Sequence, residues 1–401
     1  MELTAIGEAA VYFDPYDVQI NADPYPTYAR LLEEAPVYYN DRYDFWALSR
    51  HDDVRKALTD WPTFSNTRSD ILDIIKAGVE LPPGVVLFED PPMHTTHRGL
   101  MSRVFTPRRM ALLEDEVRRF CGRCLDPLVG EGQFDIIAEL ASILPMRVIG
   151  MLLGIPERDQ VAVRNRTDAN LRTTPGQPME VREEEVANGD MFNEYIEWRA
   201  DHPADDLMTQ LLNAEFQDEN GEQRKLTRQE VLTYTAVIAG AGNETTGRLI
   251  GWLAKVLAEH PDQRRAVAAD RSLIAGVIDE TLRFEPTGHA VARYVAQDFE
   301  AHGTVVPAGS PILLIMAAAN RDPRRYADPD RFDIHRPDVQ HLTFGYGLHY
   351  CLGANLARLE GRVALDEILN RWPDWDIDYD QMKLAPTSTV RGWECLPLLL
   401  P

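Results

Sequence analysis

The sequence contains few cysteines, four in 401 residues. So low a number excludes a disulfide-stapled scaffold and is typical of proteins kept in a reducing compartment. Long hydrophobic runs are also missing. The longest apolar window, residues 231–242, is far shorter than the roughly 20 residues that a membrane-spanning helix needs. The composition therefore predicts no membrane anchor.

Basic residues are scarce relative to acidic ones. Lys and Arg number 41, Asp and Glu number 64, and the formal net charge is −23. This balance argues against a nucleic acid or an anionic membrane as the main partner, because both would repel the chain. The opening residues, Met1-Glu2-Leu3-Thr4, lack the basic and apolar stretches of a signal peptide. We expect a cytoplasmic protein.

Repeats, low-complexity segments and linkers are absent as well, so we expect one domain over residues 1–401. Two pairs of short β-branched or aromatic runs flank turn residues and are predicted to form hairpins. The first pair is 37–39 with 45–49, and the second is 303–306 with 312–316. Most of the remainder reads as helix. The predicted fold class is mainly α with a small β region.

The longest predicted helix covers residues 227–259. Thr227 and Glu230 form a capping box at its start, and Pro261 follows its end. At about 1.5 Å per residue it would span roughly 50 Å and cross the whole domain. Its middle reads Ala-Gly-Ala-Gly at 239–242, although each glycine costs about 1 kcal/mol inside a helix. Either a bulky group approaches this backbone, or a neighbouring helix packs closely against it.

The most informative segment reads T-F-G-Y-G-L-H-Y-C-L-G over residues 343–353, ahead of a helical pattern from 354 to about 370. Gly345 and Gly347 permit a tight loop. Cys351 is expected at a helix start, where the backbone amides and the helix dipole would lower the pKa of its thiol. A single thiolate suits an axial iron ligand, whereas zinc would need more cysteine or histidine nearby. The alternative is an inert buried cysteine.

This F-G-x-G-x-H-x-C-x-G segment resembles the heme-binding loop of the cytochrome P-450 family, the heme-thiolate monooxygenases, and the chain resembles the soluble bacterial type. The resemblance implies a P-450 fold, in which the long central helix passes over heme b and a cysteine thiolate is the axial ligand. Cys351 would then bind the metal. The loop residues that the resemblance assigns to the cofactor are Thr343, Phe344, Gly345, His349, Cys351 and Gly353.

Two further family signatures occur in the expected order. Glu280 and Arg283 match E-x-x-R, and at this spacing the two side chains share a helix face. The family pairs them with a later arginine, here taken as Arg331, to brace the fold behind the heme. The sequence from Ala241 to Thr246, A-G-N-E-T-T, resembles the oxygen-activation motif. The resemblance implies that Ala241 and Gly242 leave room beside the heme.

In the same motif, the resemblance makes Thr245 and Glu244 the catalytic pair that delivers protons for cleavage of the O–O bond. Glutamate stands here where many relatives have aspartate. Alone, Glu-Thr-Thr would more often be a solvated helix face, and E-x-x-R is common on solvated helices. The assignment depends on the motifs occurring together.

The heme propionates need cationic or hydrogen-bonding partners. The segment D-P-P-M-H-T-T-H-R resembles a family signature whose His94 and Arg98 would share one helix face. Arg293 and His349 match further propionate-binding positions. Each alone would more often be a solvated side chain. His97, in the same segment, is predicted to be a surface histidine.

Cys121 and Cys124 form a C-x-x-C pair that could be a dithiol redox site. Both cysteines instead follow a helical apolar spacing, which favours a place in the core. Cys395 is also expected to be structural.

No dinucleotide-binding or iron–sulfur motif is present, so the resemblance implies an external ferredoxin and its reductase as electron donors. A positive docking surface, or a basic face without a partner, could be formed by Arg98, Arg103, Arg108, Arg109 and Arg358.

The substrate is predicted to be a hydrophobic small molecule, because the family's pocket segments are apolar in this chain. The expected lining residues are Val85, Val86, Leu87, Phe88, Val237, Ala241, Ala290, Val291 and Trp393. His289 and Glu394 could add polar contacts or be exposed. The predicted reaction inserts one oxygen atom from O2, and the protein is expected to be a monomer. The alternatives are a peroxide-using heme-thiolate enzyme and a non-catalytic heme carrier or sensor, both disfavoured by Glu244-Thr245.

Overall fold

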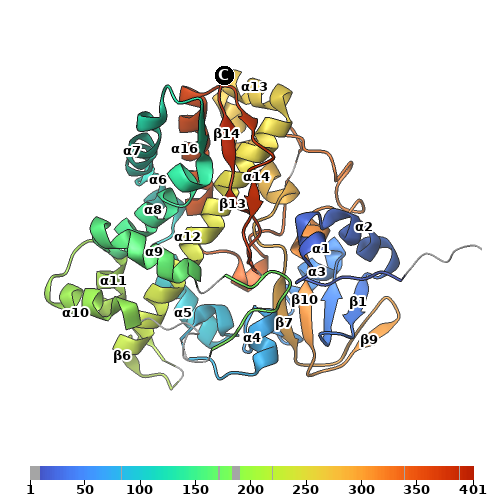
Figure 1. The fold of residues 1–401 in the computed structure, drawn as a ribbon. Helices are drawn as coiled ribbons and strands as arrows, with labels where there is room; N and C mark the ends of the chain where they lie inside the picture. The colour runs from blue at the N-terminus through green and yellow to red at the C-terminus, as the bar shows by residue number, and fades with distance from the viewer. Residues whose placement is uncertain are drawn as a thin grey trace, which may run out of the picture.

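The fold is described from a computed structural model, over residues 10–82, 84–169, 172–182, 190–218, 220–337, 339–387 and 389–401. The opening residues that were tested for a signal peptide lie outside these ranges, as does position 83, which precedes the expected substrate contacts Val85 to Phe88. Helices make up one side of the molecule and the largest β-sheet lies at the other (Figure 1). The predicted fold class, mainly α with a small β region, is confirmed.

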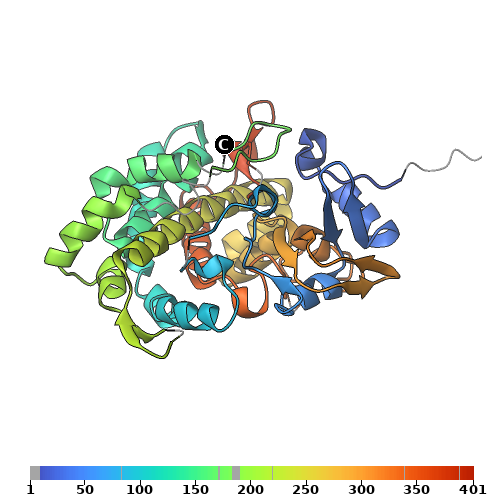
Figure 2. The ribbon, with the colours of Figure 1, turned by 90° about the horizontal axis from the view of Figure 1, so that it is seen from below.

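The central helix α12 (Arg228–Glu259) runs through the middle of the helical part (Figure 2). Its predicted capping box is present: the backbone N–H of Glu230 donates to Oγ1 of Thr227 at 3.2 Å, and Oε2 of Glu230 accepts from the backbone N–H of Thr227 at 2.6 Å. Nineteen of its side chains are buried. The helix is therefore the axis of the main core, as its length predicted.

Other helices surround α12. The longer ones are α2 (Tyr25–Glu34), α5 (Met93–Ser102), α7 (Glu114–Leu125), α8 (Leu144–Leu153), α9 (Gln160–Ala169), α10 (Asn193–Asp201), α13 (Pro261–Ala269), α14 (Ile274–Phe284) and α16 (Ala354–Arg371). The shorter ones are α1 (Val18–Ala22), α3 (His51–Ala57), α4 (Leu72–Ala77), α6 (Pro107–Ala111), α11 (Leu207–Asn213) and α15 (Met316–Ala319). Helices α8, α9, α14 and α16 pack directly on α12.

Close packing explains two glycines of α12 that the sequence pattern did not single out. A Cβ atom at Gly247 would lie 2.6 Å from the carbonyl oxygen of Ala141, and one at Gly251 would lie 2.8 Å from Cδ1 of Ile137. The neighbour of Gly247 is a backbone atom that cannot turn aside, so a side chain there would push the neighbouring segment away, whereas the neighbour of Gly251 is the end of a side chain.

The largest sheet has five strands in the order β1-β2-β10-β7-β3. They are β1 (Val37–Asn40), β2 (Phe45–Leu48), β10 (Pro311–Leu314), β7 (Val291–Val295) and β3 (Phe64–Ser65). Strands β1 and β2 form the first predicted hairpin, which is confirmed. The smaller sheets comprise β11 (Asp376–Ile377), β14 (Pro397–Leu399) and β4 (Gln133–Asp135), then β12 (Lys383–Leu384) with β13 (Trp393–Cys395), and β5 (Glu215–Gln217) with β6 (Gln223–Lys225).

The second predicted hairpin is wrong. Strand β9 (Thr304–Val306) pairs with β8 (Phe299–Ala301), whereas β10 lies parallel to β2 and antiparallel to β7. The reason is burial: Ile312 and Leu314 of β10 are fully buried, while Val305 of β9 is 56% exposed. A strand that is apolar on both faces belongs inside a sheet, and an alternating one can stay at the surface.

The prediction that Cys121 lies in the core is confirmed, because its side chain is fully buried and burial raises the pKa of its thiol. Cys124 packs half-buried against the same core cluster.

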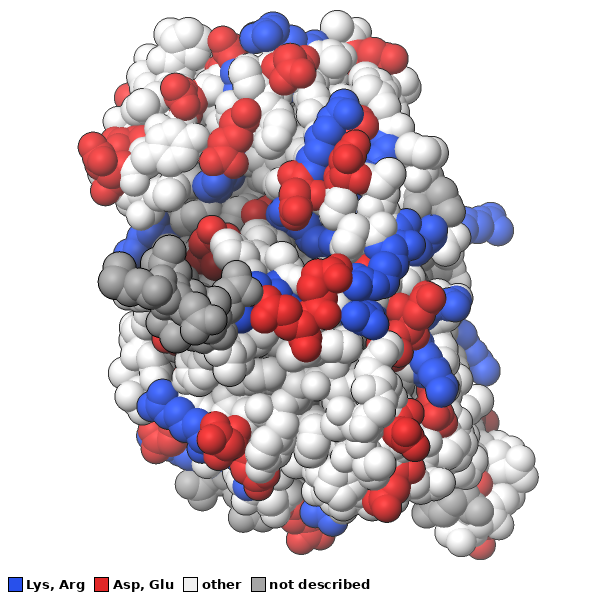
Figure 3. Space-filling view, turned by 90° about the vertical axis from the view of Figure 1, so that its right-hand side faces the viewer, with Lys and Arg blue, Asp and Glu red and all other residues white. Residues whose placement is uncertain are grey.

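Within the described ranges, no helix combines the length and the apolar character needed to cross a membrane. On the face shown in Figure 3, acidic and basic side chains are interspersed rather than separated into large single-sign areas.

Candidate active site

The cysteine loop is shaped by its two glycines. Gly345 and Gly347 have φ angles of 70° and 74°, in the left-handed region that favours glycine. The backbone N–H of Cys351 then donates to the carbonyl of Phe344 at 2.7 Å, which closes the loop. A Cβ atom at Gly353 would lie 3.9 Å from Sγ of Cys351, so this side of the sulfur is lined by backbone.

The loop is fastened to helix α14 behind it. Oγ1 of Thr343 donates to the carbonyl of Leu282 at 2.5 Å and accepts from Nδ2 of Asn320 at 2.9 Å. The helix that follows the loop, α16, begins at Ala354, three residues later than Cys351. Its predicted extent to about residue 370 is confirmed.

The predicted lowering of the thiol pKa is wrong for this chain. Burial is the largest effect and raises the pKa of the Cys351 thiol, although backbone amides at Gly353 and Ala354 and the charges of Arg98 and Arg358 lower it. Desolvation disfavours the thiolate more than these groups favour it. The chain alone therefore holds the sulfur protonated, and a thiolate here needs a cation bound to it.

Four nitrogen-bearing side chains from three segments gather beside this loop. The rings of His94 and His349 lie with centroids 4.2 Å apart. Arg98, one turn after His94 on α5, donates to the carbonyl of Tyr350, and its charge lowers the pKa of the Cys351 thiol. Arg293 of β7 is 3% exposed and donates from Nη1 to the carbonyl of its neighbour Ala292 at 2.7 Å. The structure thus brings together the four side chains that the motifs singled out.

We call His94, Arg98, Arg293 and His349 the donor cluster. Its members disfavour one another's positive charge: burial and the neighbouring cations lower the pKa of His349 to about 3, and burial lowers the pKa of Arg293 to about 10. Both ring nitrogens of His94 and Nε2 of His349 are buried without a hydrogen-bond partner among the described residues. Unpaired buried ring nitrogens beside the guanidinium groups of Arg98 and Arg293 fit an anionic group, such as the two carboxylates of a heme.

The middle of α12 has an open side. Ala241 is exposed although it lies in the middle of a buried helix. A Cβ atom at Gly240 would have no described atom within 4 Å, whereas one at Gly242 would lie 3.1 Å from Ile149 on α8. Close helix packing thus accounts for Gly242, and the open side of the helix accounts for Gly240. Thr245 lies one turn further, and its Oγ1 donates to the carbonyl of Ala241 at 2.8 Å.

Glu244 is not a free acid. Its Oε1 accepts from Nη2 of Arg248 at 2.5 Å, and Nη1 of Arg248 donates to the carbonyl of Trp393. Its Oε2 is buried without a partner among the described residues. Burial raises the pKa of the Glu244 carboxyl, and the charge of Arg248 offsets this only in part. Glu244 therefore holds a proton to a higher pH than an exposed glutamate does.

The pair formed by Glu280 and Arg283 is fully buried. Nε and Nη2 of Arg283 donate to Oε2 and Oε1 of Glu280, both at 2.8 Å. The predicted third member is corrected: Nε of Arg336, not Arg331, donates to Oε1 of Glu280 at 3.2 Å. The side chain of Arg331 is 68% exposed, and this residue contributes its backbone carbonyl, which accepts from Arg283 and from Arg336. Spacing along the chain did not show which of these two arginines turns inward.

The prediction that His97 is a surface residue is also wrong. His97 is 2% exposed, and its Nδ1 lies 2.8 Å from Oε1 of Glu89. Its ring packs edge-on against Phe216 of the β5–β6 hairpin and Tyr234 of α12. This face of α5 is covered by elements that lie more than 100 residues later in the sequence.

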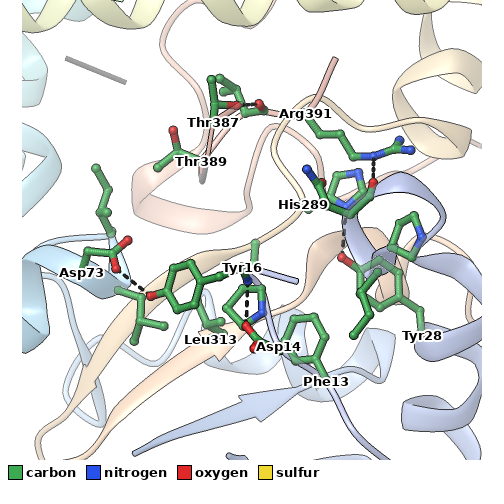
Figure 4. Close-up of a pocket in the computed structure, with 18 of the residues that line it drawn as sticks. Phe13, Asp14, Tyr16, Tyr28, Asp73, His289, Leu313, Thr387, Thr389 and Arg391 are labelled. Atoms are coloured by element: carbon green, nitrogen blue, oxygen red, sulfur yellow. Dashed lines mark hydrogen bonds between the residues drawn. The ribbon is translucent and has the colours of Figure 1, made fainter. Parts of the chain in front are cut away.

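A cavity of about 80 Å³ lies between the N-terminal segment, the start of α4 and the C-terminal loop (Figure 4). Of the residues named as substrate contacts, Ala290 lines it, and so does His289, which could have been exposed. Trp393 instead packs against Trp252 in the main core, which leaves little of its surface for a ligand. The motifs missed Thr389 and Asp70, which also line the cavity, because these positions belong to irregular segments with no local pattern.

Comparisons with known proteins agree with one family. A family model described as cytochrome P-450 matches residues 179–389. The cytochrome P-450 monooxygenase PikC of Streptomyces venezuelae is 37% identical over 94% of this chain and 91% of its own length. The vitamin D(3) 25-hydroxylase of Pseudonocardia autotrophica is 34% identical over 94% of each chain. The solved structure of CYP109Q5 from Chondromyces apiculatus has a TM-score of 0.84, with 34% identity over 97% of this chain and 98% of that chain.

The fold, the cysteine loop and these matches define a heme-thiolate oxidoreductase. The chain belongs to the cytochrome P-450 family, whose members are monooxygenases that use heme with a cysteine thiolate as the axial ligand. The family as a whole requires redox partners and acts on hydrophobic substrates.

Proposed function

We propose that this protein inserts one oxygen atom from O2 into a hydrophobic small molecule and receives its electrons from a ferredoxin through a ferredoxin reductase. The donor cluster beside the Cys351 loop carries this proposal, since it combines two guanidinium groups with buried ring nitrogens that have no partner among the described residues. In the proposal, Cys351 ligates the heme iron, and His94, Arg98, Arg293 and His349 hold the propionates. When bound, the heme supplies the activation of O2.

The chain's own contribution to the chemistry is proton delivery. Glu244 lies next to Thr245 and has one buried oxygen, Oε2, that is free to take up and release a proton. Burial raises the pKa of this carboxyl toward neutral pH, where an acid can both take up and release a proton. Arg248 holds the other oxygen, so the carboxyl must rotate or exchange partners to pass a proton to Oγ1 of Thr245. The intact Glu244-Thr245 pair supports use of O2 rather than peroxide.

Replacing Thr245 by alanine is expected to uncouple the reaction. In Thr245→Ala, NAD(P)H consumption continues, but product formed per NAD(P)H falls by about a hundredfold, the lower end of the usual contribution of a positioned proton donor. The missing electrons appear as hydrogen peroxide. Product and peroxide are measured by chromatography and by a peroxide assay during turnover.

The matched control for this prediction is Thr235→Ala. Oγ1 of Thr235 donates to the carbonyl of Val231 at 2.8 Å, the same backbone contact that Thr245 makes, but Thr235 is fully buried away from the open stretch of α12. This control keeps the wild-type ratio of product to NAD(P)H. Equal coupling in the two variants contradicts the role of Thr245.

The proposed docking surface for ferredoxin begins at the cysteine loop, where Arg98 and Arg358 donate to Tyr350, and includes the arginines that follow Arg98 in the sequence. Arg103, Arg108 and Arg109 are exposed, while Arg98 turns inward toward the loop. Arg358 is half-buried and donates to Oδ1 of Asp279 at 2.8 Å, so its charge is partly neutralised. Large exposed side chains on the loop itself are Tyr346, Leu348 and Tyr350. An apolar patch beside exposed arginines is suited to an acidic partner, because local charge outweighs net charge at contact distance.

Reversing the charges of Arg108 and Arg109 tests this surface. Arg108→Glu combined with Arg109→Glu is expected to slow reduction by ferredoxin by about tenfold at low salt, and the difference shrinks as salt screens the charges. Stopped-flow reduction of the heme gives the rate. The control Arg265→Glu changes an exposed arginine of α13 and leaves the rate unchanged. An unaltered rate in the double variant excludes this docking surface.

The substrate proposal is a bulky hydrophobic molecule, supported by the partly exposed apolar residues Leu87 and Phe88 among the expected contacts and by the name of the vitamin D(3) hydroxylase relative. We further propose that the chain acts as a monomeric, cytoplasmic, single-domain enzyme.

The whole proposal is tested with ferredoxin, reductase and a library of hydrophobic compounds. Compounds that shift the heme spectrum are expected to stimulate NAD(P)H oxidation and to gain one oxygen. Turnover with peroxide but not with ferredoxin would contradict the proposal.

A further inference from the structure

Two buried polar atoms at the cavity of Figure 4 have no partner. Nε2 of His289 and Oγ1 of Thr389 are shut off from water, and neither has a hydrogen-bond partner among the described residues. The two side chains come from segments about 100 residues apart and meet at one cavity. Buried polar atoms are rarely left unpaired, so two at one cavity point to a ligand that pairs with both.

His289 is held in place by its other nitrogen. Nδ1 lies 3.0 Å from the hydroxyl of Tyr28, and the two rings pack with centroids 5.8 Å apart. Burial and the charges of Arg391 and Arg321 lower the pKa of His289 well below its usual range, so the ring is neutral. The bond between Tyr28 and Nδ1 can run in either direction, depending on the tautomer of the ring. The tautomer in which Nδ1 accepts from Tyr28 presents an N–H at Nε2 to the cavity, and this is the tautomer that the subsite requires.

The charged groups at the cavity already have partners. Arg391 donates to the carbonyls of Asn21 and Ala22 and to Glu285, through three different nitrogens at 2.8–2.9 Å. Asp73 accepts from the hydroxyl of Tyr16 at 2.6 Å. The cavity is also lined by the carboxyl groups of Asp14 and Asp70. An anionic ligand would meet these three carboxyl groups and no free cation among the lining residues.

The cavity lies away from the reacting centre but on a strand that leads to it. The residues that line it include none from α12 and none from the Cys351 loop. His289 and Ala290 line the cavity, and Arg293 of the donor cluster follows on the same extended segment. Four residues of extended chain, from His289 to Arg293, span about 13 Å. This is the length of a medium-sized hydrophobic molecule.

We propose that His289 and Thr389 form a polar subsite that binds a neutral hydroxyl or carbonyl oxygen at the far end of the substrate. The oxygen accepts from Nε2 of His289 and exchanges a hydrogen bond with Oγ1 of Thr389. Apolar side chains on the same wall, Phe13, Ile20, Leu313 and Val390, cover the hydrocarbon next to that oxygen. The subsite thus selects amphiphilic substrates, whose polar end it holds. This inference rests on the proposed function.

Four compounds with one hydrocarbon chain and different head groups test the subsite: 1-dodecanol, dodecane, dodecylamine and dodecanoate. Their affinities for the heme-loaded protein are measured by calorimetry in the absence of reductant. We expect 1-dodecanol to bind about tenfold or more tightly than dodecane, the effect of one or two buried hydrogen bonds. Dodecanoate is expected to bind more weakly than 1-dodecanol because of the three carboxyl groups.

Two variants test whether the preference for 1-dodecanol over dodecane depends on Nε2 of His289 and Oγ1 of Thr389. His289→Phe and Thr389→Val are each expected to weaken 1-dodecanol at least about fivefold and to leave dodecane unchanged. Thr387→Val is the matched control: Thr387 lines the same cavity, but its hydroxyl already donates to the carbonyl of Val390. The carbon monoxide spectrum of each variant verifies that heme is bound, so a folding defect is recognised.

Three results overturn the subsite: equal affinities for 1-dodecanol and dodecane, a preference that survives in both His289→Phe and Thr389→Val, or tightest binding of dodecylamine or dodecanoate. Because binding is measured without electron donors, the outcome is separate from turnover. Failure of ferredoxin-driven oxidation with an intact alcohol preference would reject the proposed function and keep the subsite.

Discussion

In Cys351→Ser, substrate oxidation is expected to fall by at least about a thousandfold, equivalent to roughly 4 kcal/mol of lost transition-state stabilisation. Cys351 is the single cysteine in the loop beside the donor cluster, and a serine hydroxyl does not replace a thiolate as a soft, electron-donating ligand. The variant should still fold, because the loop is closed by backbone hydrogen bonds and by Thr343. Turnover, heme content and the spectrum of the carbon monoxide adduct are the measurements.

The control for this prediction is Cys395→Ser. Cys395 is half-buried in β13, and burial raises the pKa of its thiol to about 11, so it stays a neutral thiol. Serine at this position keeps the wild-type spectrum and activity. If Cys351→Ser retained the carbon monoxide spectrum of a thiolate-ligated heme, another residue would have to be the ligand and the proposed function would lose its basis.

Removing the carboxyl group in Glu280→Ala is expected to destabilise the fold by about 3–5 kcal/mol, the usual effect of breaking a buried ion pair. Two arginines, Arg283 and Arg336, would lose their common acceptor, and Arg283 is fully buried. A domain is stable by only about 5–15 kcal/mol, so such a loss leaves protein that binds heme poorly or not at all. Chemical denaturation and heme content after purification measure the effect.

Further variants keep this prediction testable if Glu280→Ala does not fold. Arg336→Ala removes one of the two cationic partners of Glu280 and is expected to cost about 1–3 kcal/mol, whereas Arg331→Ala stays within about 0.5 kcal/mol. Glu34→Ala, which breaks the exposed Arg30–Glu34 pair, is the matched control and also changes stability little. Equal losses in Arg331→Ala and Arg336→Ala would show that the brace is assigned to the wrong arginine.

Several parts of the fold were predictable because their causes are local. The capping box of Thr227 and Glu230 set the start of α12, and the turn between two short β-rich runs set the first hairpin. The cysteine loop was recognisable because its two left-handed positions require glycine. Helical spacing likewise placed Cys121 in the core.

Other features depend on residues that are distant in the sequence, and there the predictions failed. Strand β10 pairs with β2, some 260 residues earlier, rather than with its neighbour β9. His97 is buried because the β5–β6 hairpin and α12 cover it. The pKa of the Cys351 thiol is raised because burial, which no motif reports, outweighs nearby amides and arginines.

The sequence by itself determined the loop that carries Cys351, because that loop is a short run of residues with a fixed backbone requirement. It determined the family and the side chains that gather beside the loop through the resemblance of several motifs taken together. The tertiary structure alone decided which arginine reaches Glu280, which strand enters the sheet, and that His289 and Thr389 meet at one cavity. Those outcomes depend on which surfaces exclude water from one another, and that is a property of the packed molecule rather than of any segment.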